Sequence, residues 1–182
     1  MNMMLEKIYH YFTVLDGKLM CEIVFVFLFL FMTFVLIFRF IKDKKIRDKV
    51  LSSRFIEANR FLKSKNPIYK NGEFSKSGCY VILIFSFPVC DENYKKFDDI
   101  YIGQSLNLSK RMKQHLTGSG NKNVFRDYQK GKFIYFTFQR CQPSYMNRME
   151  KNLIRAFRST DSYNIQKGGG KHRKNIDNWK YQ

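Results

Sequence analysis

Residues 78–87, GCYVILIFSF, and residues 99–103, DIYIG, decide the fold. Both runs are rich in β-branched and aromatic residues, which favour buried strands. A turn-like loop over residues 88–98, with proline, aspartate and asparagine, joins them. An antiparallel pair is the simplest arrangement for strands joined in this way. Tyr80 and Tyr101 are therefore expected to present their phenols on one surface of a sheet.

The sequence after these strands predicts one more strand and three helices. Residues 133–139 alternate between apolar and polar side chains, as a half-buried strand does. The expected helices run from the possible caps Ser105 and Asn107 to about Leu116, over residues 124–130, and from Pro143 to about Phe157. The chain thus predicts a small α/β (α+β) domain in which helices flank a central three-stranded antiparallel sheet.

Two side chains on the first of these helices have chemistry suited to a phosphate group. Arg111 and His115 lie four residues apart, so they share one face of the helix. An arginine can hold phosphate with its planar fork, and a histidine can assist proton transfer near neutral pH. The alternative is a solvated charged face, because Lys110 and Lys113 are close by. Strand tyrosines, likewise, are usually packing residues.

Glu150 is placed on or beside the apolar stripe of the last helix. The residues four before it and three, four and seven after it are Met146, Leu153, Ile154 and Phe157. A buried carboxylate is costly without a partner, so one is expected. That partner is either an arginine or lysine or a divalent metal, and a single carboxylate with water and substrate phosphate suits Mg²⁺.

An apolar run precedes this domain. Residues 23–38, IVFVFLFLFMTFVLIF, carry no charge, and the extended segment 21–41 measures about 31 Å as a helix, enough to cross a membrane. A buried core helix and a cleaved signal peptide are the two alternatives. The run is longer than the usual signal-peptide core and no A-x-A-like site follows it. We therefore expect residues 21–41 to contact membrane lipid as a single transmembrane helix.

Charge next to this run predicts its orientation. Residues 39–49 carry six basic side chains, whereas residues 1–22 carry only Lys7 and Lys18. The positive-inside rule then places the C-terminal part in the cytoplasm. The expected organisation begins with a short N-terminal segment 1–20, a transmembrane helix 21–41 and a basic helical stalk 42–67, which ends at Pro67. A domain over residues 68–170, with a turn at Asn71-Gly72 near its start, and a basic polar tail over residues 171–182 are expected to follow.

Composition limits the class of partner. The formal net charge is +18, and residues 51–182 hold 25 basic and ten acidic side chains, a net charge of +15. Such an excess favours an anionic partner, either nucleic acid or an anionic membrane surface. The four cysteines form no CxxC pair and show no zinc-site spacing, so free thiols are expected.

In this order and at these spacings, the residues resemble the GIY-YIG nuclease superfamily over about residues 76–170. Two signatures stand as Gly78-Cys79-Tyr80 and Tyr101-Ile102-Gly103, and the later family residues stand as Arg111, His115, Glu150 in an E-x-x-L-I helix, and Asn164. Two departures are present: Cys79 replaces the isoleucine of the first signature, and Gln104 stands where some members have a lysine.

The resemblance implies hydrolysis of phosphodiester bonds in DNA with one divalent cation, Mg²⁺ or Mn²⁺, and no small-molecule cofactor. It implies that Tyr80 deprotonates or orients the attacking water, that Tyr101 positions water and phosphate, and that Arg111 stabilises the developing charge. It further implies that His115 relays the proton or holds Tyr80, and that Glu150 anchors the metal. Gly78, Gly103 and Asn164 would support the site structurally.

The sequence as a whole predicts a membrane-anchored DNA endonuclease that faces the cytoplasm and cuts DNA entering across the membrane, such as phage or transforming DNA. The alternative is a catalytically inactive, membrane-bound DNA-binding module. A mobile-element or repair nuclease is a third interpretation. Such nucleases usually carry an additional recognition domain, and no helix-turn-helix or zinc-finger pattern is present.

Overall fold

A computed structural model describes residues 6–7, 17–64 and 76–164 of the chain. The chain divides into two compact units, residues 1–42 and residues 43–182. The expected helix end at Pro67, the turn at Asn71-Gly72, the tail 171–182 and most of segment 1–20 lie outside the described residues. The four cysteines are free, as expected.

Helix α2, Gly17–Leu51, contains the apolar run and continues through it. It is long and apolar enough to cross a membrane, and its most apolar window is not buried. The large side chains of this part are exposed, Phe25 at 76% and Phe31 at 64%. Thr33 donates its hydroxyl to the carbonyl of Leu30 at 2.8 Å, so the one hydroxyl in the run is satisfied within the helix.

The second unit is built on a four-stranded antiparallel sheet. The strands are β1 Ile56–Glu57, β2 Gly78–Phe85, β3 Asp99–Ser105 and β4 Phe133–Arg140, in the order β1-β4-β2-β3. Strand β2 lies in the middle and all eight of its residues are buried. A strand buried on both faces needs apolar side chains along its whole length, and burying each large aliphatic side chain contributes about 1.5–3 kcal/mol to the stability of the fold.

The predicted three-stranded sheet is corrected to four strands by β1. Its two residues pair with Tyr135 and Phe136 of β4. They lie within residues 42–67, which the sequence predicted to be a helical stalk. Instead, α2 ends at Leu51 and α3, Ala58–Lys63, follows β1 directly. The loosely helical spacing of the apolar residues in this segment concealed a strand of only two residues.

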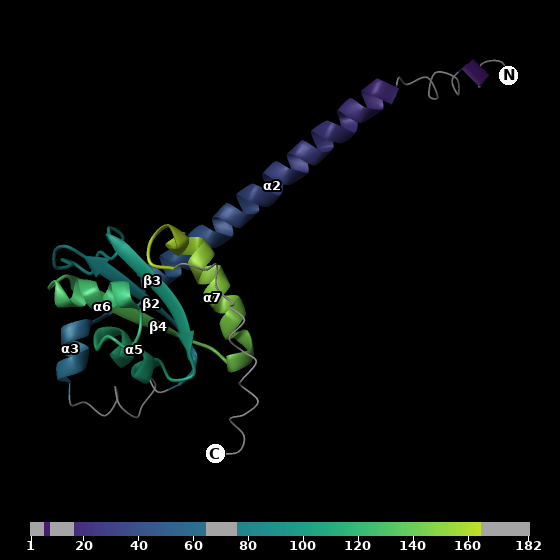
Figure 1. Cartoon of the computed structure of the whole chain (residues 1–182). Coiled ribbons are helices and arrows are strands. Elements are labelled where there is room, and N and C mark those ends of the chain that lie inside the picture. Colours follow the sequence, from purple (N-terminus) through teal and green to yellow (C-terminus); the bar gives the residue numbers. More distant parts are fainter. Residues whose placement is uncertain (1–5, 8–16, 65–75, 165–182) are drawn as a thin grey trace, which may run out of the picture. The chain divides into compact units, whose positions relative to one another are not determined.

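Helices cover both faces of the sheet (Figure 1). On one face, α7, Pro143–Phe157, packs with Val50 and Phe55. On the other face lie α3, α5, Leu108–Leu116, and α6, Lys122–Gln129. Period-two alternation in β3 and β4 divides their side chains between these two cores. The predicted bounds of α7 are confirmed, with Pro143 in its first turn.

The last turns of α2 belong to the second unit. Arg155 of α7 donates to both carboxylate oxygens of Asp43, with Nε–Oδ distances of 3.0 Å and an Nη2–Oδ1 distance of 2.8 Å. Ile46 packs against the core that contains Val50. A bidentate pair fixes geometry as well as charge. Residues 43–64 are therefore part of the folded domain rather than a stalk outside it.

Candidate active site

The side chain of Tyr80 has room for its phenol because residue 103, opposite it on β3, is a glycine. Tyr80 and Gly103 are paired across β2 and β3, so their side-chain positions lie on the same face of the sheet. A Cβ atom at Gly103 would meet the Tyr80 Oη at 2.2 Å and its Cζ at 2.5 Å. Glycine at this position therefore lets the phenol of Tyr80 lie across strand β3.

His115 holds the hydroxyl of Tyr80. The Nε2 atom of His115 lies 2.8 Å from Tyr80 Oη. Both side chains are buried, at 1% exposure for Tyr80 and 0% for His115. A solvated charged face on α5 is therefore ruled out for His115, and Tyr80 makes a buried hydrogen bond in addition to its packing contacts.

Tyr101 completes an aromatic cluster with these two residues. Its ring centroid lies 6.1 Å from that of Tyr80 and 5.1 Å from that of His115. Tyr101 pairs with Ile82 in the sheet register, so its side chain is on the same face as Tyr80. The expectation that both phenols lie on one surface is confirmed.

Arg111 supplies positive charge to the cluster. It is partly buried, and its Nη1 donates to Gln114 Oε1 at 3.1 Å. Burial raises the pKa of Tyr80 well above its usual range, with Tyr101 adding to this effect, and the Arg111 charge opposes it. Burial, assisted by the Arg111 charge, lowers the pKa of His115 to about 3. In the free protein, Tyr80 and His115 are therefore both neutral at pH 7.

Gly78, at the start of β2, allows β4 to approach. A Cβ atom there would meet the carbonyl oxygen of Gln139 at 2.4 Å and the Cα of Arg140 at 2.9 Å. The neighbouring Cys79 is fully buried, and its Sγ lies 3.4 Å from the Met146 carbonyl oxygen. Cys79 thus packs in the core that also contains Leu153 and Ile154 of α7.

Glu150 lies on α7 and faces the opposite side of β3 from the tyrosines. Its Oε2 accepts a hydrogen bond of 2.9 Å from Gln104 Nε2, which also donates to Asn147 Oδ1 at 2.7 Å. This amide is a partner that the sequence did not predict. Gln104 follows Gly103 directly, so adjacent residues of β3 contact Glu150 on one face and Tyr80 on the other.

The family comparison agrees with this geometry. Residues 76–164 match the family model described as the GIY-YIG catalytic domain. This part of the chain belongs to the GIY-YIG family. No curated protein and no solved structure matches the chain. GIY-YIG domains are nuclease domains, so the chain carries a domain of the endonuclease type.

Asn164 supports the outer edge of the GIY-YIG sheet. Its Oδ1 accepts from the Ile102 N–H at 2.9 Å, and its Nδ2 donates to the Ile102 carbonyl at 2.7 Å. Both backbone groups of Ile102, the middle residue of the second signature, are thus satisfied by one side chain. An edge strand otherwise leaves such groups unpaired. The contact holds the backbone between Tyr101 and Gly103.

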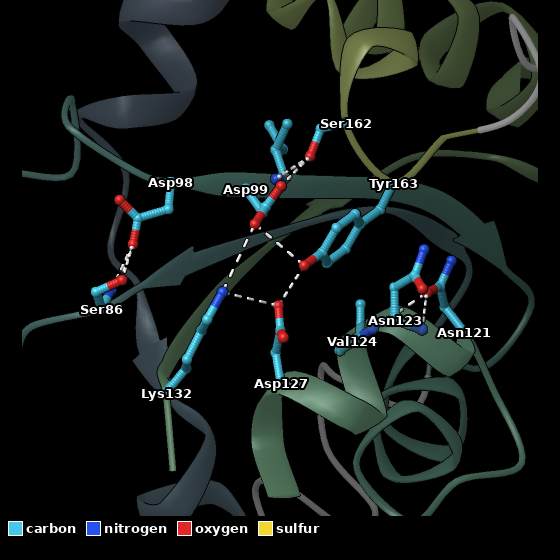
Figure 2. Close-up of polar contacts among 11 residues, drawn as sticks. Ser86, Asp98, Asp99, Asn121, Asn123, Val124, Asp127, Lys132, Ser162 and Tyr163 are labelled. Atoms are coloured by element: carbon cyan, nitrogen blue, oxygen red, sulfur yellow. Dashed lines mark hydrogen bonds and ion pairs between the residues drawn. The ribbon is translucent and has the colours of Figure 1, made fainter. Parts of the chain in front are cut away.

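A polar cluster next to Asn164 stabilises the same edge of the sheet, and no motif in the sequence indicates it. The hydroxyl of Tyr163 contacts Asp127 and lies 3.1 Å from Asp99 Oδ2. Lys132 Nζ lies 3.3 Å from Asp127 and 3.8 Å from Asp99 (Figure 2). Burial and the two carboxylates raise the pKa of Tyr163. Segments distant in sequence meet here, so only the folded chain reveals the cluster.

Stability of the GIY-YIG domain is expected to fall in mild acid because of His115. Its pKa is about 3 when folded and about 6.5 when unfolded, so the unfolded chain binds more protons between these values. The stabilising contribution is complete above pH 6.5 and is lost as the pH falls towards 3. At pH 5 the loss is about 2 kcal/mol.

Chemical unfolding of the native chain and of His115→Gln at several pH values checks this expectation. Glutamine cannot take up a proton in this range, so the stability difference between the two proteins should shift in favour of the variant as the pH falls. A difference that stays constant from pH 7 to pH 5 would contradict the predicted neutral, buried imidazole.

Proposed function

We propose that the chain is a membrane-anchored, metal-dependent DNA endonuclease that hydrolyses phosphodiester bonds. The observation that carries the proposal is the buried Tyr80–His115 hydrogen bond, with Arg111 and Tyr101 around it. A phenol held in this way and next to a guanidinium is suited to handling the proton of an attacking water. Binding DNA does not in itself require a buried phenol held at 2.8 Å by an imidazole, whereas hydrolysis does require a group that handles the proton of water.

The side chains around Tyr80 take complementary roles in this proposal. Tyr80 deprotonates or orients the water, and Tyr101 positions the water and the scissile phosphate. Arg111 stabilises the negative charge that develops on the phosphoryl oxygens. Its contact with Gln114 directs the guanidinium before substrate arrives.

Residues around Glu150 fit a hard divalent cation such as Mg²⁺ or Mn²⁺. The described residues contain no group of three or more histidine, cysteine, aspartate or glutamate side chains that could hold a metal. They do place oxygen donors beside the Glu150 carboxylate, among them Asn147 Oδ1 and Gln104 Oε1, a buried atom with no hydrogen-bond partner. One carboxylate with amide oxygens and water suits Mg²⁺. When bound, the cation would polarise the phosphate and stabilise the leaving oxygen.

DNA is the partner that the charge of the domain favours. The net charge of +15 over residues 51–182 attracts a polyanion, and cleavage should therefore weaken steeply as salt rises. Exposed lysines at positions 76, 110 and 113 lie next to or on α5, the helix that carries Arg111. These positive charges attract the phosphates of DNA next to the candidate site, and they do not distinguish one base sequence from another.

Helix α2 supports the membrane part of the proposal. Its apolar run is unburied, and six basic side chains follow it in residues 39–49, which favours a cytoplasmic nuclease domain. Confinement near the membrane would suit the cleavage of DNA as it enters the cell. In this proposal the native substrate is such incoming DNA.

Nicking of supercoiled plasmid by the full-length chain in mild detergent tests the nuclease. The full chain is used because Val50, Phe55 and Phe61 are part of the core. Cleavage is expected with Mg²⁺ or Mn²⁺, none with EDTA, and progressively less as salt rises. DNA binding without cleavage under every metal would favour the inactive binding module.

Carbonate-washed membranes should retain the chain at its full mass, whereas a cleaved signal peptide would shorten and release it.

A further inference from the structure

The Nδ1 atom of His115 has a fixed hydrogen-bonding role. It accepts a hydrogen bond of 2.8 Å from the backbone N–H of Asn121. A backbone amide is always a donor, so Nδ1 must be unprotonated. A neutral imidazole with a bare Nδ1 carries its hydrogen on Nε2. His115 is fully buried, so no solvent competes for either nitrogen.

The tautomer decides the direction of the bond between His115 and Tyr80. Nε2 lies 2.8 Å from Tyr80 Oη, and with hydrogen on Nε2 the imidazole donates and the phenol oxygen accepts. His115 then has no lone pair with which to take a proton from Tyr80. A donor aimed at a phenol oxygen favours the ionised form of that phenol.

We propose that the peptide unit between Gly120 and Asn121 is a positioning element, which holds His115 as the Nε2–H tautomer so that it donates to Tyr80 and accepts no proton from it. The consequence for catalysis rests on the proposed nuclease function. Of the two roles open for His115, proton relay and support of Tyr80, the geometry selects support. Tyr80, a neutral phenol in the free protein, would then have to release its own proton by a route other than His115 before its oxygen could take a proton from water.

Gly120 makes this contact possible. A Cβ atom there would lie 2.5 Å from His115 Nδ1 and 2.8 Å from the backbone N and Cα of the same residue. Contacts of that length do not occur, so any side chain would push the loop away from the imidazole. Glycine therefore permits the approach that brings the Asn121 N–H to Nδ1.

Helix α6 anchors the donor from its other side. Asn121 is the N-cap of α6, and its Oδ1 accepts from the backbone N–H groups of Asn123 and Val124 at 2.9 and 3.1 Å (Figure 2). The N–H that faces His115 is thus held by a helix start rather than by a free loop. Among the described residues, Arg111, Tyr80 and Tyr101 also lie around the imidazole.

Nitrogen NMR of the full-length chain in detergent, with ¹⁵N-labelled histidine, tests the tautomer directly. His115→Gln identifies the His115 signals among the three histidines of the chain. At pH 7 the expected pattern is an unprotonated Nδ1 and a protonated Nε2. A protonated Nδ1, a doubly protonated ring or a mixture of tautomers would overturn the proposal. This result does not depend on nuclease activity, so it stands or falls separately from the proposed function.

Plasmid cleavage then separates support from proton relay. In His115→Gln the amide can place an N–H donor near the position of Nε2 but cannot relay a proton. The variant is expected to keep its rate within about tenfold, whereas loss of a proton relay would cost about 10²–10⁴-fold. A loss of that size in a variant that remains folded would overturn the proposal.

Substitution of Gly120 tests the positioning element itself. Gly120→Ala should change the His115 tautomer signals and slow cleavage by about 10-fold or more, on the scale of lost supporting contacts. Gly131→Ala is the matched control, because its φ of +76° strains an alanine but no atom lies within 4 Å of the added Cβ. It should lose stability and keep both the tautomer and the rate. Unchanged His115 signals in Gly120→Ala would contradict the assignment.

Discussion

Replacing Tyr80 by phenylalanine is expected to slow DNA cleavage by about 10²–10⁴-fold, the range of a lost general base. The variant removes one oxygen atom and keeps the ring that fills the core between β3 and α5. The buried Nε2–H of His115 loses its acceptor, which costs about 1–3 kcal/mol of stability. The domain should therefore remain folded and bind DNA while turnover is lost.

Single-turnover plasmid cleavage and thermal unfolding of the same preparations measure this effect. Tyr94→Phe is the matched control, since Tyr94 is also buried, at 8% exposure, but belongs to the core on the opposite face of the sheet. It should cleave at the native rate. A Tyr80→Phe protein that cleaves as fast as this control would show that Tyr80 does not handle the proton.

Local sequence signals were strong enough to predict the sheet centre and the last helix. The run in β2 is apolar at almost every position, and a strand buried on both faces requires that pattern. Pro143 marked the start of α7, because proline fits the first helical turn. Spacing also placed Arg111 and His115 on one face of α5, and the structure brings both to Tyr80.

Contacts that depend on the backbone or on distant segments could not be predicted in this way. The donor to His115 is a backbone N–H at Asn121, a group that every non-proline residue carries. The two-residue strand β1 is too short to show a period. Gln104 marked only a departure from the family, and its bond to Glu150 spans 46 positions of sequence.

The candidate active site therefore consists of two parts that meet at strand β3. Tyr80, Tyr101, Arg111 and His115 lie on one face of β3, and Glu150 reaches Gln104 on the other. Because Gly103 and Gln104 are adjacent, a shift of β3 would move both parts together. Asn164 binds both backbone groups of Ile102, the residue before Gly103, and so limits such a shift.

Replacing Glu150 by glutamine is expected to reduce cleavage by at least about 100-fold at any metal concentration that saturates the native protein. The change keeps the volume of the side chain, and its amide oxygen can still accept from Gln104 Nε2, so the fold is preserved. What it removes is the negative charge of the carboxylate that we propose binds Mg²⁺. Metal-induced thermal stabilisation, which measures binding independently of cleavage, should disappear with it.

Glu57→Gln is the matched control for this change. Glu57 is also partly buried, and its carboxylate accepts from an amide, Asn59 Nδ2, at 3.3 Å, but it lies on β1 at the other edge of the sheet. It should keep both the cleavage rate and the metal-induced shift. If Glu150→Gln responds to Mg²⁺ and Mn²⁺ as the control does, the metal is held elsewhere, and Gln104 serves only to tie α7 to β3.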